Sequence, residues 1–137
     1  MTLTPGQYLK KRREAAGLSI DDVAERIATT PRWAQHLRRG WLEQIESDQM
    51  PATFRTIVVL HQVMQFDLGV LVALTADGCE APRLCVVCAC SEDDPCVGHS
   101  EPCGWVDVEL CSACFAHEPA DRIAIIRSAA AAREAAA

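Results

Sequence analysis

Long hydrophobic runs are missing from this sequence of 137 residues. No apolar stretch approaches the roughly 20 residues that a membrane helix needs, and residues 1–17 contain no apolar core of signal-peptide length. The composition, half apolar and about a quarter charged, is that of a soluble globular protein. We therefore expect a cytoplasmic protein that does not enter a membrane, in a reducing compartment where a disulfide scaffold is disfavoured.

Positive charge is also scarce, above all toward the C-terminal end. Residues 1–78 carry nine Lys and Arg against nine Asp and Glu, whereas residues 79–137 carry four against ten. The net charge of −6 therefore arises entirely in the second part of the chain. A nucleic-acid role cannot rest on overall charge, so it requires a local basic patch in the N-terminal half.

Large apolar side chains are few between Cys85 and Cys114, and this segment instead holds seven of the eight cysteines. So few apolar groups cannot bury enough surface to offset the entropy of ordering thirty residues. A metal ion or a covalent link must therefore hold the segment together.

The cysteine spacing favours zinc. Two C-x2-C pairs bracket the segment and supply the four thiolates of a closed tetrahedral site: Cys85, Cys88, Cys111 and Cys114. An inner set could bind a second zinc: Cys90, Cys96, His99 and Cys103. The expected cofactor is thus Zn²⁺, as one or two ions. The ligand sorting could interleave, and the alternative is a single zinc with the inner cysteines as free thiols or a disulfide.

Other cysteine chemistries fit less well. The spacing matches neither ferredoxin pattern of iron–sulfur proteins. The fragments around His99, Glu101 and Cys103 resemble those of zinc nucleobase deaminases, but here they overlap instead of standing well apart. A catalytic zinc keeps an open position, whereas ligands are in surplus here. We expect no enzyme activity.

The N-terminal part shows helix signals. Residues 5–16 predict a first helix that Pro5 opens and Gly17 ends, and its basic run, residues 10–13, is typical of a solvated helix face. Ser19 is expected to cap a second helix, with Asp22 in capping-box spacing. Residues 53–65, with Phe54 facing inward, and residues 68–74 predict two further helices.

These segments carry a family resemblance. The sequence LKKRREAAGLSIDDVAERI (residues 9–27), then WLEQIE (residues 41–46) and PATFRTI (residues 51–57), resembles the Xre/Cro-type helix-turn-helix domain of phage repressors. With its cysteine-rich tail, the chain also resembles small phage and prophage proteins. The resemblance implies a mainly α fold: a five-helix helix-turn-helix domain, a small zinc-ribbon-like module and a C-terminal helix.

We expect four segments along the chain. Residues 1–76 form the helix-turn-helix domain, residues 77–84 a linker, residues 85–117 the metal-binding module and residues 118–137 an alanine-rich helix or tail that has little to bury. Residues 104–110 predict a strand of the metal-binding module, with Trp105 as an apolar cover for a ligand.

The chain departs from the family between Ile27 and Glu46, where it is longer, and Pro31 is expected to open an additional helical turn. In addition, Ile20 stands where the family often has a glutamine that binds a DNA phosphate. The side chains that could still contact DNA are Arg32, His36, Arg38, Arg39, Trp41 and Gln44. In the alternative interpretation, an apolar packing ridge occupies this segment: Trp33, Leu37, Trp41, Leu42 and Ile45.

Two functions are compatible with this pattern. The first is a DNA-binding transcriptional regulator of phage type, a homodimer on double-stranded DNA, with the zinc module as structural support. The second is a protein-interaction adaptor that keeps the helix-turn-helix core but binds a protein partner through its acidic C-terminal module.

Overall fold

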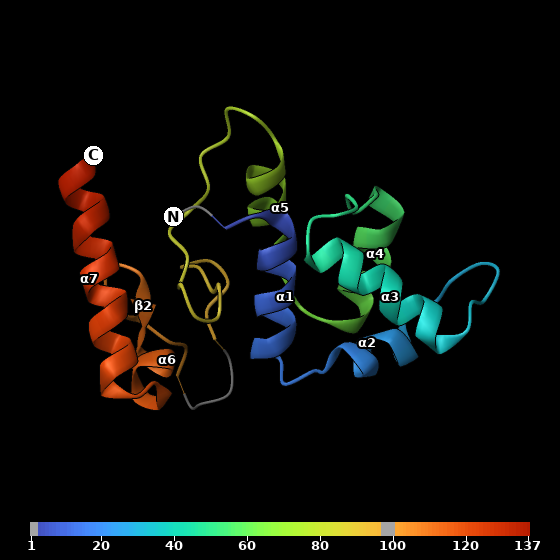
Figure 1. Cartoon of the computed structure of the whole chain (residues 1–137), viewed down its shortest axis with the longest axis horizontal. Coiled ribbons are helices and arrows are strands. Elements are labelled where there is room, and N and C mark those ends of the chain that lie inside the picture. The colour runs from blue at the N-terminus through green and yellow to red at the C-terminus, as the bar shows by residue number, and fades with distance from the viewer. Residues whose placement is uncertain (1–2, 97–100) are drawn as a thin grey trace. The chain divides into compact units, whose positions relative to one another are not determined.

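The computed structural model describes residues 3–96 and 101–137, and these residues form seven helices and one two-stranded sheet (Figure 1). The chain divides between residues 81 and 82, inside the predicted linker, into a helical unit and a cysteine unit. The helical unit contains α1 (Pro5–Ala15), α2 (Ile20–Arg26), α3 (Gln35–Glu46), α4 (Phe54–Val63) and α5 (Leu68–Thr75). The cysteine unit contains β1 (Trp105–Asp107), β2 (Leu110–Cys111), α6 (Ser112–His117) and α7 (Ala120–Ala136). The prediction of a mainly α fold with a cysteine cluster after the helices is confirmed.

The first two helices begin at capping boxes. Thr4 caps α1, and its side chain accepts a hydrogen bond from the Gln7 backbone N–H while the Gln7 side chain reaches back. Ser19 caps α2 in the same way with Asp22, as predicted. The Ser19 backbone N–H donates to the Asp22 carboxylate, which lowers the pKa of that carboxyl group. Both caps satisfy N–H groups that a helix otherwise leaves unpaired.

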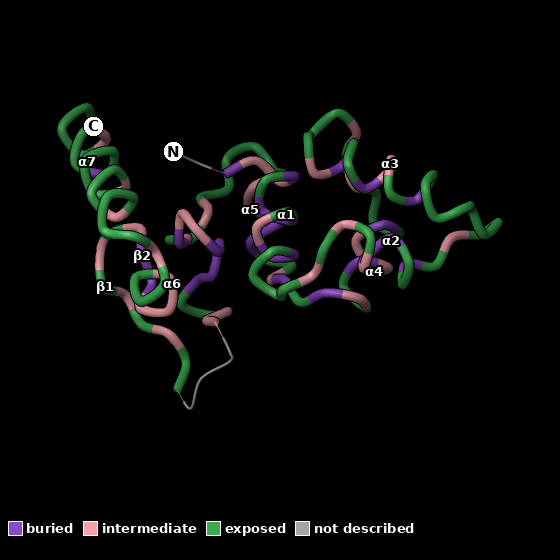
Figure 2. Tube along the Cα trace, turned by 60° about the horizontal axis from the view of Figure 1, so that its bottom comes forward, coloured by how far each residue is buried: buried purple, intermediate pink, exposed green. Residues whose placement is uncertain are grey.

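Buried apolar residues from all five helices form the core of the helical unit. Figure 2 marks the buried positions along the chain in purple. Its most enclosed members include Tyr8 and Leu9 of α1 and Val23 of α2, which have at most 1% of their surface exposed. Tyr8 also links α1 to the start of α5. The Asp67 backbone N–H donates to the Tyr8 hydroxyl at 2.9 Å, and the Asp67 carboxylate caps α5. The buried positions of α1, residues 8, 9, 12 and 13, recur at the spacing of one helix face, as expected for an amphipathic helix.

A buried ion pair joins α1 and α3. The Arg13 guanidinium donates to both carboxylate oxygens of Glu46, at 2.7 and 2.8 Å, and to the Leu18 carbonyl at 2.9 Å. Both side chains of the pair are about nine-tenths buried. The expectation that residues 10–13 form a solvated helix face is therefore wrong for Arg12 and Arg13, which are buried. A fork-shaped guanidinium that meets a carboxylate in two bonds joins α1 to the end of α3.

The same two helices approach very closely at Gly6. A Cβ atom at this position would lie 2.4 Å from the Ile45 carbonyl oxygen and 2.8 Å from that of Glu46. The Gly6 backbone N–H also donates to the Asp48 carboxylate at 2.8 Å. Since backbone carbonyl groups cannot move aside cheaply, the packing of α1 on α3 requires glycine here.

We expect Gly6→Ala to lower the free energy of unfolding of the helical unit by about 1–3 kcal/mol, the usual range for overpacking. Gly40→Ala is the matched control, because a Cβ there meets no described atom within 4 Å. In the middle of α3 this control should stabilise the unit by about 1 kcal/mol through helix propensity. Urea unfolding of the two variants, followed by circular dichroism, checks the prediction, and equal midpoints would contradict it.

Two expectations for the middle of the helical unit are wrong. Residues 31–34 do not form a helical turn, and α3 begins only at Gln35. Thr30 and Pro31 lie in the loop between α2 and α3. Phe54 was expected to face inward, but 82% of its surface is exposed. Phe54 is the first residue of α4, directly after the cap Thr53. Leu60 is the apolar residue of this helix that is buried in the core.

The cysteine unit differs from expectation in its strand and its last helix. A single strand was predicted over residues 104–110, but residues 105–111 form a short antiparallel hairpin, in which β1 pairs with β2 in an irregular register. The alanine-rich helix α7 is not an unattached tail, because Ile123 and Ile126 pack against the core of this unit. Arg127 pairs with Asp107, and Arg133 pairs with Glu109. Charge pairs and two isoleucines thus attach α7 to the hairpin.

Candidate metal centre and nucleic-acid interface

The cysteine unit has a core made largely of sulfur. Cys85, Cys88, Cys90 and Cys111 are buried together with Leu110, and the three other cysteines of the segment pack against them. All eight cysteines of the chain are free thiols, and Cys79 is exposed. Three sulfur pairs of the cluster lie 3.5–3.8 Å apart, far beyond the bond length of about 2.0 Å in a disulfide. The structure therefore has none of the disulfides that were left open for the inner cysteines.

A tight turn brings the first three cysteines together. The Ala89 backbone N–H donates to the Cys85 carbonyl at 2.8 Å, and the Cys85 N–H donates to the Cys90 carbonyl at 2.9 Å. Ala89 has a positive φ of 59°, which turns the chain back at the point where Cys90 follows. This left-handed residue allows Cys85, Cys88 and Cys90 to point at one centre.

Backbone amides also point at the sulfur atoms. The Cys114 N–H donates to the Cys111 sulfur at 3.5 Å, so that Cys111 caps α6. The Cys96 N–H donates to the Cys103 sulfur at 3.1 Å. Donation to sulfur stabilises the thiolate form, which is the form that binds metals.

The sulfurs fall into two groups of four whose atoms lie within 4.8 Å of one another. The first group is Cys85, Cys88, Cys90 and Cys111, and the second is Cys90, Cys96, Cys103 and Cys111. Each differs from its predicted set in one member. Cys90 stands in the first group where Cys114 was predicted, and Cys111 stands in the second where His99 was predicted. His99 lies outside the described residues.

Cys114 nevertheless lies beside the first group. Its thiol is hydrogen-bonded to Cys85 and Cys88, and this contact is the largest cause of the lowered pKa of each. The pKa of Cys88 falls to about 6. Among the described cysteines, Cys114 therefore belongs to the cluster without belonging to either group of four.

The thiols of the cluster oppose one another electrostatically. The hydrogen bond with Cys85 raises the pKa of Cys90, and burial raises that of Cys96 and brings that of Cys111 to about 11. Without a cation, several of these thiols therefore stay protonated, because neighbouring thiolates and burial disfavour further negative charge. A divalent cation at the centre would let all four sulfurs of a group ionise at once, so the cluster is compatible with metal binding.

An apolar and cationic cover closes one side of the cluster. Trp105 packs against the buried cysteines, and the Arg83 guanidinium stacks over its ring at 4.1 Å from the centroid. Arg83 also donates to the carbonyl groups of Asp107 and Val108. The expectation that Trp105 covers the ligands agrees with this packing. The role of Arg83 was missed, because a single arginine in a linker carries no sequence signal for stacking.

The side chains predicted to contact DNA differ in their exposure. Arg32, His36 and Gln44 are exposed and Trp41 is half-buried, with its ring edge against Trp33 at 5.9 Å. The prediction needs correction at Arg38, which is 4% exposed and donates to the Glu25 and Ile27 carbonyl oxygens at 3.1 and 3.0 Å. This guanidinium satisfies the end of α2 and cannot reach DNA.

Arg39 is exposed but engaged. It forms ion pairs with Asp21 of α2 at 3.3 Å and with Glu43 of α3 at 3.0 Å. Exposed pairs of this kind contribute little stability, so a phosphate can displace the carboxylates at low cost. Arg39 therefore stays available for DNA contact, although the two carboxylates beside it, Asp21 and Glu43, repel phosphate.

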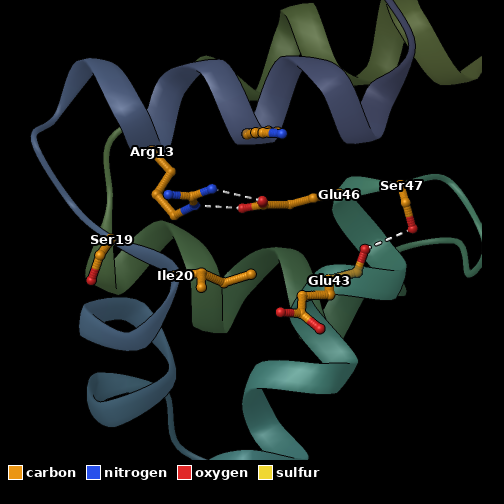
Figure 3. Close-up of a pocket in the computed structure, with 7 residues that line it drawn as sticks. Arg13, Ser19, Ile20, Glu43, Glu46 and Ser47 are labelled. Atoms are coloured by element: carbon orange, nitrogen blue, oxygen red, sulfur yellow. Dashed lines mark hydrogen bonds and ion pairs between the residues drawn. The ribbon is translucent and has the colours of Figure 1, made fainter.

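A pocket of about 390 Å³ lies between α1, α2 and α3 (Figure 3). Ile20 forms part of its wall, at the position where the resembled family often has a phosphate-binding glutamine. Of the two cations that line it, Arg13 is bonded to Glu46, and Glu43 lies nearby. The pocket is consequently poorly suited to a phosphate group.

Comparisons of this chain with protein-family models, with curated proteins and with solved structures find no match. Within residues 3–96 and 101–137, none of the helices combines the length and apolar character needed to cross a membrane. The functional argument therefore depends on the geometry alone.

Proposed function

We propose that the protein is a DNA-binding transcriptional regulator whose cysteine unit holds structural zinc. The observation that carries the DNA-binding part is the placement of Arg32 and His36, which are exposed at and just before the start of α3. Helix-turn-helix proteins contact DNA with the N-terminal residues of such a helix. Ala34 caps α3 without a side-chain hydrogen bond, which leaves backbone N–H groups at this end for a phosphate.

Zinc is the metal that best fits the cysteine unit. Thiolate ligands in groups of four select soft or borderline cations, and four protein ligands close a structural site. The acidic surface of this unit makes it unsuited to DNA, so its role is to support the fold or to provide a protein-binding or dimerisation surface. Two copies on one duplex would strengthen a weak contact by each helical unit.

We expect the purified zinc-loaded protein to bind duplex DNA with an affinity that falls steeply with salt. Arg32→Glu should weaken binding and reduce the slope of log K against log salt by about 1, which corresponds to one lost phosphate contact. Fluorescence anisotropy against random-sequence duplexes and the DNA that flanks its own gene measures both quantities. Arg122→Glu is a charge-matched control in the cysteine unit, where Arg122 is exposed and pairs with Glu118. Absence of binding at low salt would refute the proposal.

A second candidate function, a protein-interaction adaptor, is favoured by one observation. Trp33 and Leu37 expose 41% and 54% of their surface on the same segment as the arginines. Exposed aromatic and apolar groups beside arginine are typical of protein-binding hot spots. Leu37→Ser separates the functions, because it removes the exposed apolar contact without adding charge: it should abolish self-association or partner binding in the second case and leave salt-dependent DNA binding in the first.

A further inference from the structure

The two groups of four sulfurs overlap. Cys90 and Cys111 belong to both groups, so six cysteines occupy eight ligand positions. We propose that the cysteine unit binds two zinc ions as one binuclear cluster, in which the thiolates of Cys90 and Cys111 bridge the metals. This inference rests on the zinc centre of the proposed function. Cys85 and Cys88 are then terminal ligands of one zinc, and Cys96 and Cys103 are terminal ligands of the other.

Two of the sulfur separations match this arrangement. A tetrahedral zinc with Zn–S bonds of about 2.3 Å holds its sulfurs about 3.8 Å apart. The Cys88 and Cys111 sulfurs, both in the first group, are 3.8 Å apart, and the Cys90 and Cys103 sulfurs, both in the second, are 3.7 Å apart. Both of these edges end at a shared cysteine. Each metal therefore has at least one tetrahedral edge in place that includes a bridging ligand.

The two groups are also too close for independent sites. The Cys88 sulfur of the first group is 3.5 Å from the Cys96 sulfur of the second. No protein layer separates ligand sets whose terminal members touch in this way. Two metals bound here lie next to each other, and shared ligands are the arrangement that keeps two cations together.

Sharing also lowers the buried charge. The two separate sites predicted from the sequence, with four thiolates in one and three thiolates and a neutral histidine in the other, would carry −3 in total, whereas six thiolates and two divalent cations carry −2. The unit compensates for part of this with N–H donation to the sulfurs of Cys103 and Cys111. Since burial of uncompensated charge is costly, the shared arrangement fits a small core better.

A route for the metals is present as well. A hollow of about 220 Å³ lies beside the second group and is lined by Cys90, Cys103 and Cys111. Glu92 also lines it, and its carboxylate can attract a cation on entry. An entry path is among the features that a metal site needs.

Native mass spectrometry of the zinc-loaded protein tests the stoichiometry, and we expect two zinc ions per chain. Cys90→Ser and Cys111→Ser each remove a ligand from both metals, so both ions should become removable by a chelator that leaves the wild type loaded. Cys85→Ser removes a terminal ligand, so one ion should remain tightly bound. A wild type that binds a single zinc overturns the proposal.

Control variants separate the bridged cluster from two independent sites. Cys114→Ser and Cys79→Ser should retain two ions, because neither residue belongs to the two groups. His99→Ala should also retain two. If Cys114→Ser or His99→Ala loses one ion and Cys90→Ser retains one, the predicted separate sites are correct and the bridged cluster is not.

Cadmium-113 NMR of the wild-type protein supplies a test that no folding defect can disturb. In a proton–cadmium correlation spectrum, the β protons of Cys90 and Cys111 should each correlate with both cadmium signals, and those of Cys85 with one. Two cadmium signals without shared correlations overturn the bridging. Failure of the proposed zinc centre is distinguishable, because the chain would then bind no metal at all.

Discussion

Removal of the metal should unfold the cysteine unit and leave the helical unit folded. The core of the cysteine unit consists of thiols with a few apolar neighbours, mainly Leu110, Trp105, Ile123 and Ile126. Apparent binding energies of structural zinc reach about 10–16 kcal/mol, far more than such a core supplies. The helical unit has its own core and its own caps, so it does not depend on the metal.

Two-dimensional amide NMR before and after chelation measures this effect residue by residue. Resonances of residues 82–137 should collapse to the narrow range of an unfolded chain, and those of residues 3–81 should keep their dispersion. Added zinc should restore the original spectrum. Cys79→Ser, which alters an exposed thiol outside the cluster, is the control and should behave as the wild type. Full dispersion of residues 82–137 in metal-free protein would show that the thiol core folds without a cation.

The helices were predictable because their signals are local. Ser19 and Asp22 specify the start of α2 through a contact three residues apart, and Gly17, with a φ of 71°, ends the first helix as expected. The periodic apolar residues of α4 and α5 likewise indicated helices within two residues of their observed bounds. Local spacing and propensity suffice for such elements.

The burial of charged side chains was not predictable in the same way. Arg13 and Arg38 look like surface cations in the sequence, but each finds oxygen partners that are distant along the chain. Arg13 meets Glu46, 33 positions away, and Arg38 meets carbonyl groups at the end of α2. The residues next to an arginine in the sequence do not show whether the folded chain will bring a hydrogen-bond partner to it.

The cysteine segment was predictable in kind but not in detail. C-x2-C spacing identifies cysteines that can share a centre, and those cysteines do pack together in one core, although Cys114 joins neither group of four. Which sulfur joins which group depends on the turn at Ala89 and on the hairpin that carries Cys111. These are three-dimensional constraints, and they place Cys90 and Cys111 between the two groups.

Glu46→Gln should lower the free energy of unfolding of the helical unit by about 3–5 kcal/mol, because it leaves the buried Arg13 guanidinium with only the exposed Glu14 carboxylate, 3.9 Å away, as counter-charge. The Glu46 carboxylate raises the pKa of Arg13, so this arginine stays charged in the folded protein. Glu43→Gln is the matched control on the same helix. Its carboxylate pairs with exposed Arg39, so its loss should cost less than about 1 kcal/mol. Urea unfolding followed by circular dichroism gives both values.

The double variant Arg13→Met with Glu46→Leu decides why the first change is costly. If the cost comes from an unpaired buried charge, replacement of both partners by apolar side chains should recover most of the lost stability, as buried ion pairs often tolerate. If the double variant is as unstable as Glu46→Gln, the two hydrogen bonds between α1 and α3 provide the stability themselves. Equal losses for Glu46→Gln and Glu43→Gln would contradict both accounts, because burial would then have no bearing on the strength of the pair. Recovery would indicate that the Arg13–Glu46 pair adds little net stability. Its role would then be to fix how α1 packs on α3, together with the close contact at Gly6.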